Sequence, residues 1–342
     1  MRRLLIVIAL LLPLGLSFAW ALVSLRPQTA PLDFQTPPPV IWASKTVTPT
    51  FDFQAFLPIV STAGTRSWGQ VANWVYWIDE PDLTAIGNTS YNLAVIDYSR
   101  DAGPQGEFTF AEIQKLRQGS ACKRRVLAYL SIGEAEDYRW YWQPGWGPGN
   151  PGWIVKADPD WPRNYYVKFW DPEWQNILYA YLDRILAAGF DGVYLDRPDV
   201  IDQPYAQGHE QDMVNLVLAI ASYGRARSPL REDWGVFPQN AEELGSHDEY
   251  LAVATGIGIE ELYYAATNVR VPESERLYRE GDVDRFKQAG HGGLILTVDY
   301  TNQTAQVDEA YARAASKGYV EYATNVELDR LRVNAGHEPT CR

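Results

Sequence analysis

The 342-residue sequence has few of the residues that bind metal ions or build disulfide frameworks. It contains two cysteines, and its four histidines are His209, His247, His291 and His337. The histidines form no HxH or HExxH pattern, so a metal-dependent amidohydrolase or deacetylase is not expected. Cys122 and Cys341 either form one disulfide, which would tie the C-terminal tail to the loop before the third expected strand, or stay as two free thiols. We predict no metal and no cofactor.

Nucleotide-binding motifs and positive charge are also scarce. The sequence has no P-loop, no glycine-rich nucleotide motif and no G-x-S-x-G elbow. Lys and Arg number 30 against 43 Asp and Glu, which gives a formal net charge of −13. A nucleic-acid partner is therefore not expected. Aromatic residues are abundant instead, with 13 Trp and 21 Tyr, and many of them lie in loop-like sequence where flat rings can stack on sugars.

The N-terminal segment has the features of an export signal. Two arginines precede an uncharged, mostly apolar run, and Ala19-Trp20-Ala21 offers a cleavage site with small residues. The run is also long enough to stay as a membrane anchor, so residues 1–23 are predicted to be either a signal peptide or an anchor. Residues 24–65 are rich in Pro and Thr and are predicted to form a flexible linker. The rest of the chain is expected to be extracellular or held at the cell surface.

Residues 66–342 repeat one pattern. An apolar strand ends in a polar residue, an irregular loop follows, and a helix then leads to the next strand. Helix signals include a capping box at Thr109 and Glu112 and a start at Asp171-Pro172. The expected strands are Trp74–Ile78, Leu93–Ile96, Val126–Ile132, Gly192–Leu195, Gly235–Pro238, Gly256–Ile259, Leu294–Val298 and Tyr319–Ala323.

Eight such units predict an α/β fold with a single (β/α)8 TIM barrel, in one domain that we expect to be a monomer. A doubly wound open sheet is the alternative, but the glycine fingerprint after its first strand is missing. In a barrel the active site lies at the C-terminal ends of the strands. The residues expected to bind substrate there are Asp79, Asp97, Tyr98, Glu134, Tyr194, Arg197, Asp199, Asn240, Tyr263 and Asp299.

Strand alternation selects two carboxylates for catalysis. In the stretch GVYLD, Val193 and Leu195 are expected to face the helices, which places Asp196 on the inner side. The same alternation in GIGIEE places Glu260 inside and Glu261 at the rim. Because one strand separates the two, their carboxylates are expected to flank a single glycosidic bond.

A tryptophan-rich loop follows the third expected strand. Residues 138–161 hold five Trp among Gly and Pro, which is typical of a stiff aromatic wall for a saccharide chain. We expect Trp140 and Trp142 to contact substrate. The other interpretation is that these rings pack among themselves, because a long loop needs apolar contacts of its own.

The motifs also resemble a known family. The stretches YLSIGEAEDYRWYW at 129–142, YYVKFWDPEW at 165–174, GFDGVYLDRPD at 189–199, PQNAEEL at 238–244 and GIGIEELYY at 256–264 are similar to the polygalactosaminidase family of glycoside hydrolases, in particular to its poorly characterised prokaryotic branch. The resemblance implies a (β/α)8 barrel, endo-cleavage of α-1,4-linked galactosamine polymers, and catalysis by Asp196 and Glu260.

We therefore predict a glycoside hydrolase that acts on an α-linked, amino-sugar-containing polysaccharide through two carboxylates, with retention of configuration. The alternative function is a tethered, non-catalytic barrel that binds carbohydrate for adhesion. Paired inward carboxylates favour the enzyme, since a binding protein has no need of them.

Overall fold

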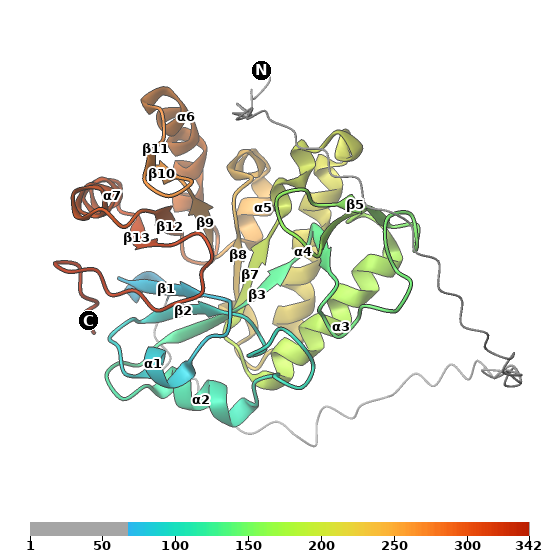
Figure 1. Cartoon of the computed structure of the whole chain (residues 1–342), viewed down its shortest axis with the longest axis horizontal. Coiled ribbons are helices and arrows are strands. Elements are labelled where there is room, and N and C mark those ends of the chain that lie inside the picture. The colour runs from blue at the N-terminus through green and yellow to red at the C-terminus, as the bar shows by residue number, and fades with distance from the viewer. Residues whose placement is uncertain (1–67, 342) are drawn as a thin grey trace, which may run out of the picture. The chain divides into compact units, whose positions relative to one another are not determined.

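The computed structural model describes residues 68–341 (Figure 1). The signal or anchor predicted at residues 1–23 and the linker predicted at residues 24–65 lie outside these residues. Within the described part, strands and helices alternate along the chain, as the sequence predicts. No helix of this part is both long enough and apolar enough to cross a bilayer.

Eight parallel strands form two sheets that follow the order of the chain. The first sheet has the order β1-β2-β3-β7-β8 and the second has the order β9-β12-β13. A parallel bridge between Gln239 and Gly258 joins the end of β8 to β9. This order lacks the reversal that marks the switch point of a doubly wound sheet. The strands are β1 (Trp74–Trp77), β2 (Leu93–Ile96), β3 (Arg125–Ser131), β7 (Gly192–Asp196), β8 (Gly235–Pro238), β9 (Gly256–Glu260), β12 (Leu294–Tyr300) and β13 (Val320–Thr324).

Helices connect these strands and cover the outer side of the sheets (Figure 1). The α-helices are α1 (Leu83–Gly87), α2 (Phe110–Gln118), α3 (Pro172–Ala188), α4 (Glu210–Arg227), α5 (Asp248–Val253), α6 (Glu273–Val283) and α7 (Thr304–Lys317). Short 3-10 helices are η2 (Trp68–Gln70), η3 (Pro198–Asp202), η4 (Pro204–Ala206), η5 (Arg231–Asp233), η6 (Glu242–Ser246) and η7 (Asp284–Gln288).

The helix termini follow from local chemistry. The Thr109 side chain accepts the N–H of Glu112, whose carboxylate accepts the N–H of Thr109, so the predicted capping box begins α2. Asp171 caps α3 in the same way by accepting the N–H of Glu173. Helix α3 ends at Gly189, whose φ of +81° places it in the left-handed region. A side chain there would also meet the ring of Phe110, because an added Cβ would lie 2.6 Å from it.

The inner faces of the two sheets pack against each other through aromatic rings. Trp74 of β1 lies 5.9 Å from Tyr322 of β13, measured between ring centroids. Tyr194 of β7 reaches Gly258 of β9, where an added Cβ would lie 1.8 Å from the Tyr194 hydroxyl. Glycine at 258 therefore makes room for this ring, and the contact confirms that Tyr194 and Gly258 share the inner side.

Loop residues form two further small sheets that the sequence did not predict. One is antiparallel with the order β4-β6-β5, and the other is a hairpin of two short strands. Their strands are β4 (Glu134–Glu136), β5 (Ile154–Ala157), β6 (Asn164–Val167), β10 (Tyr264–Ala265) and β11 (Val269–Arg270). The first sheet lies within and beside the tryptophan-rich loop, which is therefore more regular than expected.

Most rings of that loop pack inside it. Trp153 is buried and lies 5.1 Å from Trp146 and 5.2 Å from Trp174, measured between ring centroids. Trp161 differs, because 47% of it is exposed. The expectation of a wall made by the whole loop is therefore wrong for Trp153, since its ring forms part of the apolar core.

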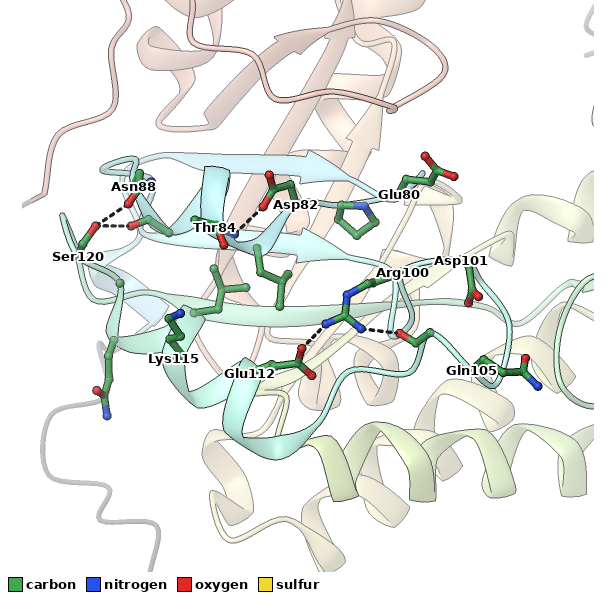
Figure 2. A pocket seen from close by; sticks show the side chains of 17 residues that line it. Glu80, Asp82, Thr84, Asn88, Arg100, Asp101, Gln105, Glu112, Lys115 and Ser120 are labelled. Atoms are coloured by element: carbon green, nitrogen blue, oxygen red, sulfur yellow. Dashed lines mark hydrogen bonds and ion pairs between the residues drawn. The ribbon is translucent and has the colours of Figure 1, made fainter.

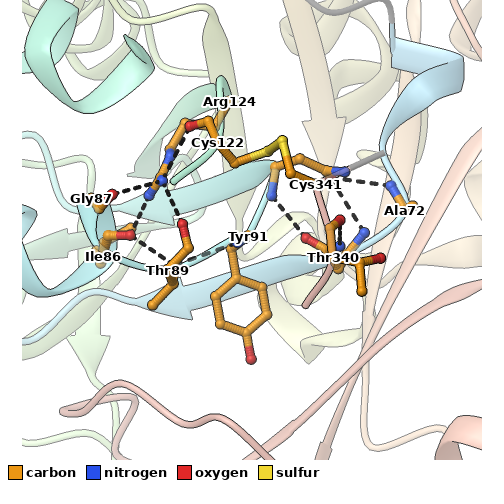
Figure 3. Close-up of a disulfide and its surroundings, with 11 residues drawn as sticks. Ala72, Ile86, Gly87, Thr89, Tyr91, Cys122, Arg124, Thr340 and Cys341 are labelled. Atoms are coloured by element: carbon orange, nitrogen blue, oxygen red, sulfur yellow. Dashed lines mark hydrogen bonds between the residues drawn. A yellow bond between two sulfur atoms is a disulfide. The ribbon is translucent and has the colours of Figure 1, made fainter. Parts of the chain in front are cut away.

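A disulfide joins Cys122 to Cys341 (Figure 3). Of the two states that the sequence allowed, the structure thus has the cross-linked one. Beside it, the Arg124 guanidinium donates to the carbonyl of Thr89 at 3.0 Å. The side-chain amide of Asn73 donates to the carbonyl of Thr340 at 2.9 Å. The disulfide and the Asn73 hydrogen bond tie the C-terminal tail to the segments that precede β3 and β1, at the end of the strands opposite to the predicted active site.

Candidate active site

A cavity of about 560 Å³ lies where the C-terminal ends of the parallel strands meet. Residues at or near the ends of all eight strands line it, namely Ile78, Asp97, Tyr129, Asp196, Gln239, Glu260, Tyr300 and Val326. Six of the predicted site residues are among the lining residues, namely Asp79, Asp97, Glu134, Asp196, Arg197 and Glu260. The structure therefore brings together the two carboxylates that strand alternation selected.

Asp196 is the last residue of β7, and it is held by two hydrogen bonds. The Tyr129 hydroxyl donates to Oδ2 at 2.6 Å, and the backbone N–H of Arg197 donates to Oδ1 at 2.9 Å. Tyr129 reaches Asp196 because β3 pairs with β7 in parallel and aligns Ser131 with Asp196. Each carboxylate oxygen thus has one donor, and the side chain remains partly exposed to the cavity.

Glu260 ends β9 and has more donors than Asp196. Gln239 Nε2 and Asn240 Nδ2 both donate to Oε2, the latter at 3.2 Å, and the Tyr300 hydroxyl donates to Oε1. The backbone N–H of Glu260 donates to Asn240 Oδ1 at 3.0 Å, which locks the two residues together. Tyr76 extends the network by donating to Gln239 Oε1 at 2.9 Å. Glu260 is therefore fixed from three strands around it.

Burial raises the pKa of both carboxyls. The pKa of Glu260 rises to about 7, first because of desolvation and then because the Asp196 charge opposes a second negative charge nearby. The pKa of Asp196 rises to about 6, again through burial, while the guanidinium of Arg197 and the Tyr129 hydrogen bond act in the opposite direction. Of the two carboxyls, Glu260 thus has the higher pKa and Asp196 the lower one.

The backbone just beyond the strands is strained. Arg197, Asn240 and Glu261 have φ values of +67°, +57° and +55°, in the left-handed region that non-glycine residues avoid. Each follows a strand that ends in the site. Strained backbone of this kind concentrates at functional sites, where the surrounding structure holds it in place.

A second acidic group lies beside Asp196. Arg197 Nη2 approaches Glu134 Oε1 at 2.6 Å and Asp158 Oδ2 at 3.2 Å. Burial raises the pKa of Glu134 to about 9, although the charge of Arg197 acts against this rise. Glu134 is thus neutral at pH 7, and its hydrogen bond to Asp158 lowers the pKa of Asp158. The cluster presents acceptor oxygens to the cavity without a full charge on every carboxyl.

Asp97 is held by Arg139. Arg139 Nη1 donates to Asp97 Oδ2 at 2.6 Å, and Arg139 Nε donates to Glu136 Oε2 at 2.6 Å. Burial raises the pKa of Asp97 to about 6 against the effect of Arg139. All three residues line the cavity. They form a part of its wall in which one guanidinium holds two carboxyl groups.

Several predicted binding residues do not line the cavity. Tyr98 and Tyr263 are buried, and Tyr194 lies buried among inner-face rings. Asp299 is buried, and its Oδ1 accepts the backbone N–H groups of Tyr263 and Tyr264, each at 2.6 Å. The chain alternates along β12, so Tyr300 faces Glu260 and Asp299 faces the other side.

The remaining predicted residues lie at the edge of the site or outside it. Asn240 supports Glu260 without lining the cavity. Asp199 Oδ1 lies 4.0 Å from Arg197 Nε. The Arg184 guanidinium covers the ring of Trp140, and Trp142 stacks on Tyr165, at centroid distances of 4.0 and 4.8 Å. Neither tryptophan lines the cavity, because Trp140 packs against helix α3 and Trp142 packs against strand β6.

The predicted site residues leave out three cavity residues that donate hydrogen bonds to Asp196 or Glu260, namely Tyr129, Gln239 and Tyr300. The exposed Trp161, which belongs to the tryptophan-rich loop of the predicted aromatic wall, also lines the cavity. Alternation along β12 is a signal for Tyr300, and alternation along β8 is one for Gln239. Among residues 68–341, no group of three or more His, Cys, Asp or Glu side chains is arranged to hold a metal ion.

Comparisons with known proteins identify the family of this chain. The model of glycoside-hydrolase family GH114 matches residues 59–339. An uncharacterized protein of Thermotoga maritima is 34% identical over 78% of this chain and 85% of its own length. An uncharacterized protein of Deinococcus radiodurans is 35% identical over 88% of this chain and 90% of its own length.

Two solved structures share the fold. The glycoside hydrolase domain of PelA from Pseudomonas aeruginosa aligns with a TM-score of 0.58 and 19% identity, over 77% of this chain and 98% of that domain. Ega3 of Aspergillus fumigatus, in complex with galactosamine, aligns with a TM-score of 0.56 and 16% identity, over 78% of this chain and 95% of that protein. The chain belongs to glycoside-hydrolase family GH114, and it is a glycosidase.

Proposed function

We propose that this glycosidase cleaves an α-linked, amino-sugar-containing polysaccharide inside the chain, by a retaining mechanism with Asp196 as nucleophile and Glu260 as acid and base. The main observation that supports the proposal is the arrangement of Asp196 and Glu260. Two carboxyls on strands separated only by β8 lie in one cavity, and hydrogen bonds fix both. Their pKa values are raised to different levels, which suits one ionised and one protonated group.

The reaction takes two steps. In the first, the ionised carboxylate of Asp196 bonds to the anomeric carbon while the glycosidic C–O bond breaks, and Glu260 gives its proton to the leaving oxygen. In the second, the Glu260 carboxylate removes a proton from water. The water oxygen then bonds to the anomeric carbon and the ester bond to Asp196 breaks, which restores both groups. Donors on Glu260 hold its carboxyl in place for both transfers.

The acidity of the cavity supports an amino-sugar substrate. Asp79, Asp101 and Glu327 line the same cavity as the reacting pair, and the whole chain carries a net charge of −13. Carboxylates attract the ammonium group of a de-N-acetylated hexosamine and repel a uronic acid. Ega3, a structural neighbour of this chain, has been solved with galactosamine, which agrees with this choice.

Further parts of the proposal concern the fold and the location of the protein. One cavity is lined by the ends of all eight strands, and the Trp74 indole of β1 donates to the carbonyl of Val320 of β13 at 3.0 Å. Both observations support a closed (β/α)8 barrel. The apolar N-terminal run supports export, with a secreted or surface-tethered product.

The test is a panel of polymers incubated with the purified protein, namely α-1,4-linked polygalactosamine, its N-acetylated form and a neutral α-glucan. Mass spectrometry of the products is expected to show new reducing ends with the amine polymer first, and NMR of early products is expected to show α-anomers. Glu260→Gln is the matched inactive control. A protein that retains the polymers and yields no new ends would support the carbohydrate-binding alternative instead.

A further inference from the structure

A second cavity, of about 960 Å³, lies between α1 and α2 (Figure 2). Glu80 and Asp101 lie toward the end of the view where β1 and β2 finish, whereas Asn88 and Ser120 lie at the opposite end. The cavity therefore runs along the outer side of the first strands. We call it the α1–α2 groove.

The groove adjoins the active-site cavity. Glu80, Arg100 and Asp101 line both cavities. A ligand that occupies the active site can therefore continue past these three residues into the groove. Glu80 lies at this junction, and its side chain is exposed. Its φ of +51° lies in the left-handed region, which residues other than glycine rarely adopt.

Part of the groove wall is held rigidly. Arg100 forms an ion pair with Glu112, and its guanidinium also donates toward the carbonyl of Gly106. Asp82 Oδ1 accepts the backbone N–H of Thr84 at 2.8 Å and caps α1. The shape of the groove is thus set by bonds within the protein, before any ligand binds.

Other side chains of the groove are free to bind a ligand. In the described part of the chain, the side chains of Glu80, Gln105, Lys115 and Gln118 have no hydrogen-bond or ion-pair partner. All four are exposed. Amide, carboxylate and ammonium groups of this kind exchange water for the hydroxyl and amine groups of a sugar chain at little cost.

The charge and polarity of the groove narrow the class of ligand. The charged lining residues are Glu80, Asp82, Asp101, Glu112, Arg100 and Lys115, so carboxylates outnumber cations by four to two. No aromatic ring lines the groove. A polyanion would be repelled, and an apolar ligand would find only Pro81, Leu83 and Leu116. A neutral or cationic hydroxylated polymer fits best.

We propose that the α1–α2 groove binds sugar residues of the same chain whose scissile bond lies between Asp196 and Glu260. This inference rests on the proposed function and adds a binding site away from the reacting bond. A chain held in both cavities is cut at internal bonds, because sugar residues extend beyond the active site on the groove side. The groove thus accounts for endo-cleavage of a long polymer.

The experiment places two positive charges in the groove. The double variant Gln105→Lys and Gln118→Lys changes two exposed residues and equalises the groove charges. Its matched control, Gln207→Lys and Gln288→Lys, adds the same charges at exposed positions that line neither cavity. The kcat/KM is measured with polygalactosamine and with a short galactosamine oligomer that the active-site cavity alone can hold.

The groove variant is expected to lose roughly tenfold in kcat/KM on the polymer, since each new charge opposes the substrate amines at short range. Activity on the oligomer is expected to stay unchanged, and added salt should shrink the loss. An unchanged polymer rate would overturn the inference, and so would an equal loss on the oligomer or in the control variant.

The same variants separate this inference from the proposed function. If the wild type cleaves neither substrate, the proposed function fails, and the groove is judged by binding alone. Polygalactosamine is then titrated into the Glu260→Gln protein with and without the two groove lysines. A roughly tenfold higher Kd with the lysines would support the groove, and equal Kd values would reject it.

Discussion

Strand β7 carries an aspartate at each end, and the two have opposite surroundings. Asp191 directly precedes the strand and is fully buried. It lies 2.8 Å from Arg117 of α2 and 3.4 Å from Arg125 of β3, and it accepts the backbone N–H of Val126 at 2.8 Å. Asp196 closes the strand, remains partly exposed, and has as donors a tyrosine hydroxyl and a backbone N–H.

Burial is the first cause of a raised pKa at both positions. At Asp191, two guanidinium groups act against that rise, and both also fasten neighbouring elements to the strand. Beside Asp196, by contrast, the guanidinium of Arg197 forms its ion pairs with Glu134 and Asp158. A carboxylate that is fully paired holds the fold together, whereas one that is partly paired stays available for a substrate.

The largest effect is expected from Asp196→Asn. Losing the proposed nucleophile should lower kcat by about 10⁴-fold or more, because the covalent step of the proposed mechanism has no substitute. The free energy of unfolding should stay within about 1 kcal/mol of the wild type, because Asn has the same shape, its Oδ1 still accepts one of the two hydrogen bonds, and its Nδ2 can donate to the Tyr129 hydroxyl in place of the other. Initial rates on the cleaved polymer and urea denaturation measure the two quantities. A loss smaller than tenfold would exclude Asp196 as the nucleophile.

Asp191→Ala should have the reverse profile. Removing this carboxylate leaves Arg117 and Arg125 buried without it, which should cost about 3–5 kcal/mol of unfolding free energy. The rate per folded molecule should remain near that of the wild type, since the site is at the other end of the strand. Urea denaturation followed by activity under native conditions checks both. Equal stability of this variant and the wild type would mean that Asp191 is not a structural anchor.

Much of the fold could be predicted because it depends on local patterns. Apolar runs and alternation located all eight strands within two residues of their observed ends. The caps at Thr109, Asp171 and Gly189 involve neighbours in sequence, so the sequence alone identifies them. The sheet of β4, β5 and β6 depends on pairing across the tryptophan-rich loop, and local patterns carry no such information.

The site residues could be predicted where strand alternation was used to select them. They could not be predicted where residue type alone was used. Alternation placed Asp196 and Glu260 in the cavity. Asp299 was chosen for its charge, whereas the strand directs its neighbour Tyr300 to Glu260. The partnership of Tyr129 with Asp196 needs the register between β3 and β7, which only the folded structure supplies.

Removing the disulfide is expected to weaken the Asp191 end of the strands without touching catalysis. The double variant Cys122→Ser and Cys341→Ser frees the two residues, which are separated by 219 positions. The free energy of unfolding should fall by about 2–4 kcal/mol, because the unfolded chain is no longer cross-linked. Urea denaturation measures the loss, and the kcat of the folded protein serves as the control. A parallel fall in kcat would show that the two ends of the strands are coupled.

The smallest expected effect is a shift in the pH dependence of activity. It tests the proposed roles of the two carboxyls at the Asp196 end of the strands. In the proposed mechanism activity needs Asp196 ionised and Glu260 protonated, so it should rise as pH increases through about 6 and fall as pH increases through about 7. The Tyr129 hydroxyl stabilises the Asp196 charge, and the Tyr300 hydroxyl stabilises the Glu260 charge.

Tyr129→Phe should therefore raise the pKa of Asp196 and move only the acidic limb of the profile upward, by about one pH unit. Tyr300→Phe should raise the pKa of Glu260 and move only the alkaline limb upward by a similar amount. Each variant is the control for the other in kcat/KM measured from pH 4 to about 9. If both variants moved the same limb, the assignment of acid and nucleophile to these two residues would have to be abandoned, since their hydrogen-bond partners are separate.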